Sequence, residues 1–294
     1  MDGYLSPKTL ADALGTSESS VRRWCDAGKM AAIRTAGGHR RIARAEAMRF
    51  VGSSDFTVVR PELLADELSG IGEVSEDAVK NALKSGDGRV LCALLSALYD
   101  RGVPIAEICD GAIRAAMTEL GDQWEKGNKE DAILAEHRAT GLCLEGLSRL
   151  RAKTSPPPAR SPIAVGGTPP DDPYVLPTWM VATVLADLGI HVTNLGASLP
   201  VDLLLRHAKK VEADLLWLSV SVSDLPPGFA DSIASVLRQI EKEGRHLMVG
   251  GRAVEAYSWP ASQALHLFRD LTEMAAFVRG FMISRQRESM SAFD

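Results

Sequence analysis

In the first fifty residues, apolar side chains recur at helical spacing in two short runs, and a glycine separates the two runs. Leu14 and Val21 fall where the buried faces of two short helices would lie. Gly15 between them supplies the backbone freedom that a tight turn needs, and Ser17 can cap the second helix, residues 17–26. The pattern therefore predicts a helix–turn–helix.

A longer amphipathic pattern follows between residues 75 and 153. Apolar stripes recur through it, and the breaks fall at 85–88 and 102–104. The stretches 105–124 and 131–150 are long enough for two full helices. Four or five helices of this length predict a bundle.

Beyond a proline-rich segment the pattern alternates between short β-branched runs and amphipathic runs. Strands are predicted at 163–165, 191–195, 215–222, 246–249 and 265–267, and helices at 175–188, 201–211, 229–243 and 271–285. This alternation predicts a parallel, doubly wound sheet, whose ligands bind at the carboxyl ends of the strands.

The predicted fold class is multidomain, α and α/β. It consists of a winged helix–turn–helix head (1–55), a connector with one short helix (56–74), a four-helix bundle (75–153), a stiff proline-rich linker (154–161) and a Rossmann-like domain (162–294).

Charge separates the head from the rest. Residues 1–52 hold nine Lys/Arg and five Asp/Glu, a net charge of +4, whereas the whole chain is −5. A basic head on an acidic body suits a protein that binds nucleic acid at one end. No signal peptide or membrane-spanning run is apparent, and the four cysteines form no Cys-x-x-Cys pair, so we expect a cytoplasmic protein without a metal site.

Two segments of the head carry donors for DNA. The second helix offers short and long donors to base edges and phosphates, and the glycines of the stretch 34–41 permit a hairpin, or wing, flanked by cations. The predicted DNA-binding residues are Ser19, Ser20, Arg22, Arg23, Arg34, His39, Arg40 and Arg41.

The head resembles the winged-helix domain of the MerR family. The matching residues are Val21-Arg-Arg-Trp24, Asp26-Ala-Gly28 and Gly37-Gly-His-Arg-Arg41. The resemblance implies a double-stranded DNA operator. Trp24 is expected to lie in the core and not to contact DNA. A head this small implies binding as a dimer or tetramer.

The whole chain is similar to the cobalamin-dependent, light-sensing repressors of carotenoid genes. In that family a bundle tryptophan and a Glu-His pair cover the upper face of the corrin, which matches Trp124 and Glu136-His137. Small residues at two strand ends leave room for the nucleotide tail, which matches Ser219-Val-Ser221 and Gly250-Gly251. The interval from Trp124 to Glu136 is two residues longer than is usual there.

One departure bears on the cofactor. The family's Asp/Glu-x-His-x-x-Gly loop places a histidine below the cobalt, but the corresponding stretch here reads Asp172-Pro-Tyr-Val-Leu-Pro177, with Tyr174 at the histidine position. Neutral tyrosine is a poor cobalt ligand. The pocket therefore binds adenosylcobalamin without a lower histidine, has lost its ligand, or binds a different tetrapyrrole such as the linear bilin biliverdin. A bilin could attach to the thiol of Cys109 or Cys143.

These features favour a transcriptional regulator, a repressor, switched by a light-absorbing tetrapyrrole. The alternative is a ligand-free regulator whose sensor serves oligomerisation or contact with another protein. An enzyme, a fragment of a cobalamin mutase or methyltransferase, would leave the DNA-binding head unexplained and would need a substrate barrel that the sequence does not contain. We therefore expect no catalytic activity.

Overall fold

The computed structural model describes residues 4–35, 38–52, 58–60, 75–124 and 129–291. The chain divides into two compact units, residues 1–73 and 74–294, each with its own fold. None of the helices within these described ranges is long and apolar enough to cross a membrane.

The first unit is a helix–turn–helix with a three-stranded antiparallel sheet in the order β1-β3-β2. Ser17 accepts a hydrogen bond from the backbone of Ser20 and so caps the second helix, as predicted. Gly15 in the turn has a φ of +60°, and a Cβ there would lie 2.8 Å from Val59 Cγ2. The elements are β1 (Tyr4–Leu5), α1 (Pro7–Ala13), α2 (Glu18–Asp26), β2 (Ile33–Arg34), β3 (Arg40–Ala43) and α3 (Arg44–Gly52).

The core of this unit gathers the apolar positions of the helical pattern. Leu10, Val21 and Ile42 are fully buried, and Trp24 packs on Phe50 with 5.1 Å between ring centroids. Trp24 therefore belongs to the core, as expected.

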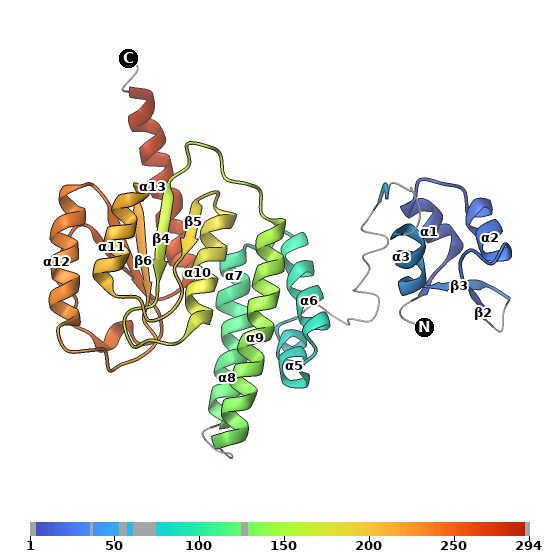
Figure 1. Ribbon diagram of the computed structural model, residues 1–294, viewed down its shortest axis with the longest axis horizontal. Coiled ribbons are helices and arrows are strands. Elements are labelled where there is room, and N and C mark those ends of the chain that lie inside the picture. The colour runs from blue at the N-terminus through green and yellow to red at the C-terminus, as the bar shows by residue number, and fades with distance from the viewer. Residues whose placement is uncertain (1–3, 36–37, 53–57, 61–74, 125–128, 292–294) are drawn as a thin grey trace. The chain divides into compact units, whose positions relative to one another are not determined.

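The second unit begins with the helical bundle (Figure 1). Its described helices are α5 (Glu76–Ser85), α6 (Gly88–Asp100), α7 (Ile105–Ile108), α8 (Arg114–Trp124) and α9 (Lys129–Lys153). The predicted single helix over 105–124 is interrupted by a π-helical turn, Cys109–Ile113, between α7 and α8. Such turns often mark functional positions.

A five-stranded parallel sheet completes the second unit, in the order β5-β4-β6-β7-β8. Helices α10 and α13 cover the face next to the bundle, and α11 and α12 cover the other face (Figure 1). The elements are β4 (Ile163–Gly167), α10 (Val175–Asp187), β5 (His191–Asn194), α11 (Val201–Lys210), β6 (Leu215–Ser219), α12 (Phe229–Lys242), β7 (His246–Gly250), β8 (Leu265–Phe268) and α13 (Leu271–Ser291).

The predicted fold class is confirmed in all three parts: head, bundle and doubly wound sheet. The chain order reverses direction across the sheet at β4, between β5 and β6, and ligands of such sheets bind at the carboxyl ends of the strands at this switch point.

Candidate functional site

A cavity of about 640 Å³ lies in the second unit, between the bundle and the carboxyl ends of the strands. Its walls come from α8 and α9 on one side, and from the start of α10, the ends of β6 and β7 and the turn from β8 to α13 on the other. The volume falls in the range of small-molecule and cofactor sites.

Most of the wall is apolar, and four methionines contribute to it. Met117 lies on the bundle side, and Met180, Met248 and Met274 lie on the sheet side. Methionine is flexible and polarisable, so this lining can adapt to a flat, irregular ligand. Trp217, only 1% exposed, forms part of the wall, and its indole N–H donates to Thr178.

The loop after β4 is organised by a buried carboxylate. Asp172 is fully buried and accepts hydrogen bonds from the backbone N–H of Ser221 (2.6 Å) and of Tyr174 (3.1 Å). One side chain thus joins the end of β6 to the start of α10. Buried carboxylates need such partners, so Asp172 fixes the floor of the cavity.

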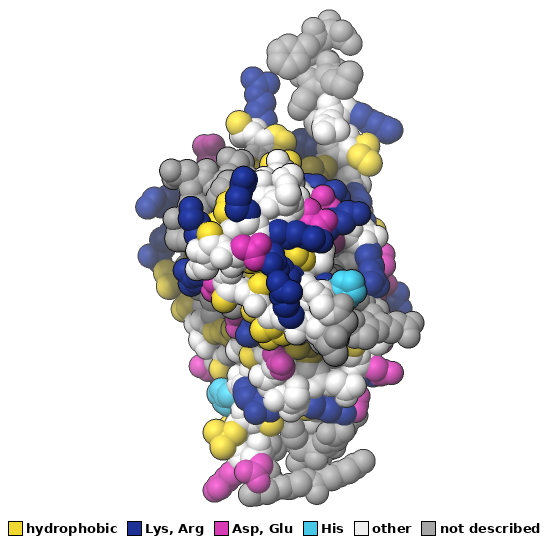
Figure 2. Space-filling view, turned by 90° about the vertical axis from the view of Figure 1, so that its right-hand side faces the viewer, with side chains coloured by type: hydrophobic (Ala, Val, Ile, Leu, Met, Phe, Trp, Pro, Cys, Tyr) yellow, Lys and Arg dark blue, Asp and Glu magenta, His cyan; other side chains and the backbone are white. Residues whose placement is uncertain are grey.

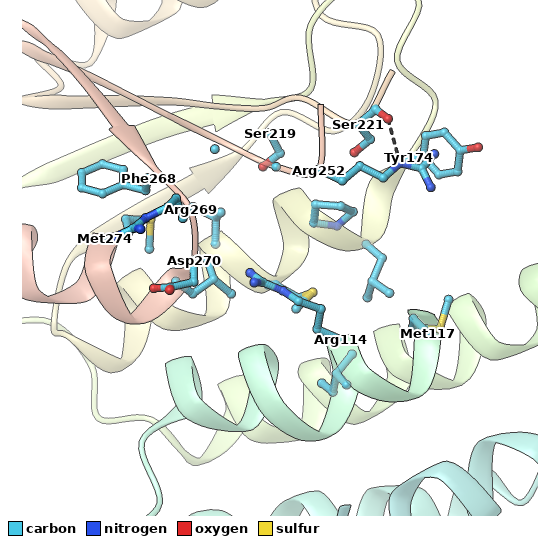
Figure 3. Close-up of a pocket in the computed structure, with 18 of the residues that line it drawn as sticks. Arg114, Met117, Tyr174, Ser219, Ser221, Arg252, Phe268, Arg269, Asp270 and Met274 are labelled. Carbon is cyan, nitrogen blue, oxygen red and sulfur yellow. Dashed lines mark hydrogen bonds between the residues drawn. The ribbon is translucent and has the colours of Figure 1, made fainter. Parts of the chain in front are cut away.

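Tyr174 and Arg252 stand together at one end of the cavity (Figure 3). Tyr174 is the N-cap residue of α10, and the guanidinium carbon of Arg252 lies 4.4 Å from its ring centroid. Arg252 Nε also donates to the carbonyl of Ser221 at 2.8 Å. The tyrosine at the expected cobalt-ligand position therefore supports an arginine.

Gly250 ends β7 and Gly251 follows it, and the surrounding backbone leaves little room for a Cβ at either position. Gly251 has a φ of +119°, and a Cβ there would lie 2.2 Å from the carbonyl oxygen of Val220. A Cβ on Gly250 would lie 3.1 Å from the carbonyl oxygen of Phe268. Both glycines line the cavity, but their closest contacts are with neighbouring backbone.

Most of the predicted cofactor residues meet at this cavity. Its lining includes Glu136, Tyr174, Ser219, Ser221, Gly250 and Gly251. Trp124 ends α8, but its side chain is outside the part that the structure describes.

His137 is a correction to the sequence prediction. Its side chain is exposed and is not part of the cavity lining. Adjacent residues on a helix point about 100° apart, and on α9 it is Glu136 that faces the cavity while His137 points away from it.

Sequence reasoning missed three arginines that line the cavity. Arg114 pairs with Asp110 at 2.8 Å and Arg269 pairs with Glu273, whereas Arg252 follows the glycine pair directly. The sequence analysis had already assigned Gly250-Gly251 to the cofactor site, so the next residue, Arg252, could have been predicted to lie there as well. Arg114 shares a helical face with Met117 and Gly121, a spacing that the amphipathic pattern contained.

Neither buried bundle cysteine is placed for covalent attachment. Cys109 and Cys143 are fully buried and do not line the cavity. Burial raises the pKa of the Cys109 thiol far above its ordinary value and that of Cys143 to about 12. Both therefore remain thiols near neutral pH, and a thiol is a poor nucleophile.

The described walls of the cavity hold no imidazole that could bind a metal. None of the described lining residues is a histidine, and no group of three or more His, Cys, Asp or Glu comes together in the described ranges. The described lining combines apolar side chains with the charged groups of Arg114, Arg252 and Asp270 and contains no histidine.

In the first unit, the predicted DNA-binding residues lie on α2 and on the β2–β3 hairpin. Figure 2 shows several Lys and Arg side chains on the face toward the viewer. Arg23, Arg34 and His39 are exposed. Arg22 pairs with Glu18 at 2.6 Å, and Arg40 pairs with Asp26 and donates to the carbonyl of Arg22. Arg40 therefore fastens the hairpin to α2.

The remaining predicted contacts also have partners inside the unit. The hydroxyls of Ser19 and Ser20 both lie within hydrogen-bond distance of Ser17 Oγ. Arg41 is partly buried and donates to the carbonyl of Arg40. These three side chains contribute to local order, and their contact with DNA stays a prediction.

Comparisons with known proteins agree with this architecture. Residues 4–51 match the family described as helix-turn-helix domain, and residues 75–151 match the family described as B12 binding domain. Dimethylamine corrinoid protein 1 of Methanosarcina acetivorans is 25% identical over 208 residues, 70% of this chain and 87% of that protein. Dimethylamine corrinoid protein 2 of the same organism is 26% identical over 163 residues, 54% of this chain and 70% of that protein.

Among solved structures, the monomethylamine corrinoid protein of Methanosarcina barkeri is similar with a TM-score of 0.51. The identity is 18%, and the match covers 68% of this chain and 94% of that one, so the likeness concerns the fold. The chain thus joins a helix–turn–helix domain to a bundle and Rossmann-like sheet of the B12-binding type.

Proposed function

We propose that this chain is a transcriptional regulator that binds an operator through residues 4–51 and a tetrapyrrole in the cavity of its second unit. The observation that carries the proposal is the position of that cavity. It lies at the switch point of the sheet, beneath a bundle that matches the B12 binding domain, in a chain that begins with a helix–turn–helix. In this proposal the chain is a cytoplasmic regulator and not an enzyme.

The lining residues guide the choice of tetrapyrrole. Tyr174 stands where a lower histidine would be expected, and no described lining residue is a histidine. A linear bilin such as biliverdin needs no axial ligand, and the relatives named as corrinoid proteins keep cobalamin as the other candidate. The apolar walls and methionines would hold the ring system, and Tyr174 and Arg252 would order its polar edge.

Light is the signal that a tetrapyrrole suits best, because its conjugated system absorbs visible light. A light-driven switch requires that the dark and lit ligands differ in affinity for two protein states. The head contributes few contacts on its own, so operator binding is proposed for a dimer or tetramer whose assembly responds to the ligand. The proposed sense of control is repression.

The decisive experiment is an absorption spectrum of full-length protein from cells supplied with cobalamin or with biliverdin. Operator binding is then measured by gel shift in the dark and after illumination. A coloured protein whose operator affinity changes with light supports the proposal. A colourless protein that still binds its operator supports instead a ligand-free regulator, whose second unit serves oligomerisation or protein contact.

A second titration tests the tyrosine. Tyr174→His is expected to raise the affinity for adenosylcobalamin, because imidazole is the better cobalt ligand, and to lower or leave unchanged the affinity for biliverdin. A spectrum of histidine-ligated cobalamin in the wild-type protein would contradict this role for Tyr174.

A further inference from the structure

The side chain of Arg252 is exposed, but two contacts fix its position. Its Nε donates to the carbonyl of Ser221, and its guanidinium stacks on the Tyr174 ring. Among the described residues, the terminal N–H groups of this guanidinium donate to no acceptor, and Arg252 lines the cavity. Within the described ranges no carboxylate pairs with Arg252, whereas the other two lining arginines pair with Asp110 and Glu273.

A buried hydroxyl lies beside this arginine. Ser221 is 5% exposed and lines the cavity, and its Oγ has no hydrogen-bond partner among the described residues. The rest of Ser221 is fully engaged, since its N–H donates to Asp172 and its carbonyl accepts from Arg252. Buried hydroxyls in proteins are normally paired, so the orphan Oγ indicates a partner that comes from the ligand.

The N-terminal end of α10 adds a third source of positive charge at the cavity. Tyr174 caps this thirteen-residue helix without any side-chain hydrogen bond to the first turn, and Leu176 and Pro177 of that turn line the cavity. The N-terminal end of a helix carries partial positive charge and favours an anion. All three features therefore favour an anionic group of the ligand: the Arg252 guanidinium, the Ser221 hydroxyl and the end of α10.

We infer that Arg252 and Ser221 Oγ form an oxyanion subsite that binds a negatively charged arm of the cavity ligand. This inference rests on the proposed tetrapyrrole function and specifies which ligands suit it. Neutral amide arms would leave the guanidinium without a counter-ion, whereas an oxyanion accepts from both donors. The oxyanion is either a propionate carboxylate of a linear tetrapyrrole or the phosphodiester of a nucleotide-bearing corrinoid.

The test compares ligands that carry the anionic group with ligands that lack it. Full-length protein is titrated by absorbance with biliverdin and its dimethyl ester, and with cobalamin and cobinamide, which lacks the nucleotide and its phosphate. The wild type is expected to bind the anionic member of one pair about 10–100-fold more tightly, the range for hydrogen bonds to charged groups. The preferred pair identifies the source of the oxyanion.

Variants assign the preference to the subsite. Arg252→Gln should abolish the difference within the preferred pair, and Ser221→Ala should reduce it while leaving the arginine in place. The matched control is Arg238→Gln, which removes an exposed arginine from α12, on the other face of the sheet, and should keep the full preference. Circular dichroism confirms that each variant is folded.

Two outcomes overturn the subsite. The first is equal binding of both members in both pairs, and the second is an undiminished preference in Arg252→Gln. Either result leaves the tetrapyrrole proposal intact, because the chromophores still bind. Failure of all four chromophores to bind refutes the proposed function as well, so the two failures are distinguishable.

Discussion

At the scale of single residues, hydrogen bonds between a few buried polar groups hold the wall of the cavity in place. Asp172 receives two backbone N–H groups that come from different elements, β6 and the start of α10. The residue next to it, Asp171, is exposed and has a φ of +59°. Two adjacent aspartates thus have opposite environments, although the sequence presents them as a pair.

This contrast gives a prediction for stability. Asp172→Asn places an amide where two donors already point, so one buried donor loses its acceptor. The free energy of unfolding should fall by about 1–3 kcal/mol. Asp171→Asn is the matched control, since asparagine tolerates positive φ, and should change it by less than about 0.5 kcal/mol. Urea unfolding followed by tryptophan fluorescence measures both, and equal effects would contradict the assigned role of Asp172.

Neighbouring arginines on α2 give a second prediction. Arg23 is exposed and makes no ion pair with any described residue, whereas Arg22 pairs with Glu18. Arg23→Ala should weaken operator binding and lower the slope of log affinity against log salt by about one. Arg22→Ala should change the slope less, because Glu18 already offsets its charge. The reverse order, measured by titration at several salt concentrations, would show that DNA displaces Glu18 from Arg22.

At the scale of elements, α13 is held at its start and near its middle by groups that the sequence pattern could not pair. Near its start, Asp110 of the π-helical turn accepts hydrogen bonds from the backbone N–H groups of Leu271 and Thr272. Further along, Phe277 and Phe281 pack on the histidine pair, whose rings are tilted by 51° with centroids 5.1 Å apart; Phe277 contacts both rings and Phe281 contacts His246. The two imidazoles lie 3.0 Å apart, Nδ1 to Nε2, so they share one proton or none.

The histidine pair should make stability depend on pH. Burial lowers the pKa of His246 below its ordinary 6.5, and burial followed by repulsion from His246 lowers that of His266. Between these values and 6.5 the unfolded chain binds more protons than the folded one. The contribution to stability is therefore complete above about pH 6.5 and is lost as pH falls through the lowered pKa values.

Denaturant midpoints above and below pH 6.5 measure this effect. The double variant His246→Phe/His266→Phe should flatten the pH dependence over this interval, because phenylalanine keeps the aromatic packing and does not titrate. His207→Gln on α11 removes one histidine elsewhere and serves as the control. An unaltered pH dependence in the double variant would assign the effect to other groups.

The helices and strands were largely predictable, because an element that buries one face has apolar residues at a regular spacing in its sequence. All five strands of the parallel sheet and three of the helices that flank it fall within a few residues of their predicted ranges, whereas α13 runs six residues beyond its predicted end at 285. The π-helical turn was not predictable, since its residues continue a helical pattern and its Asp110 binds residue 272, far along the chain. For the same reason the arginines of the cavity were missed, because charged residues on a helix or loop are ordinarily solvated.

At the scale of the whole molecule, the two units should respond separately to heat. The head buries its own cluster around Leu10 and Ile42, and the sheet buries another around Leu216 and Ile233. Calorimetry of the full chain should show two unfolding transitions. A ligand at about one hundred times its Kd should raise only that of the second unit, by roughly 5–10 °C. Operator DNA should move the other transition, and a single transition that shifts as a whole would contradict this independence.

The same separation has an evolutionary consequence. Because each unit closes its core with its own residues, recombination within the segment that joins them would exchange one DNA-binding head for another and leave the sensing cavity whole. The operator sequence that is recognised and the ligand that is bound could then change independently in evolution. Lineages that carry this cavity should accordingly be found behind heads of more than one kind.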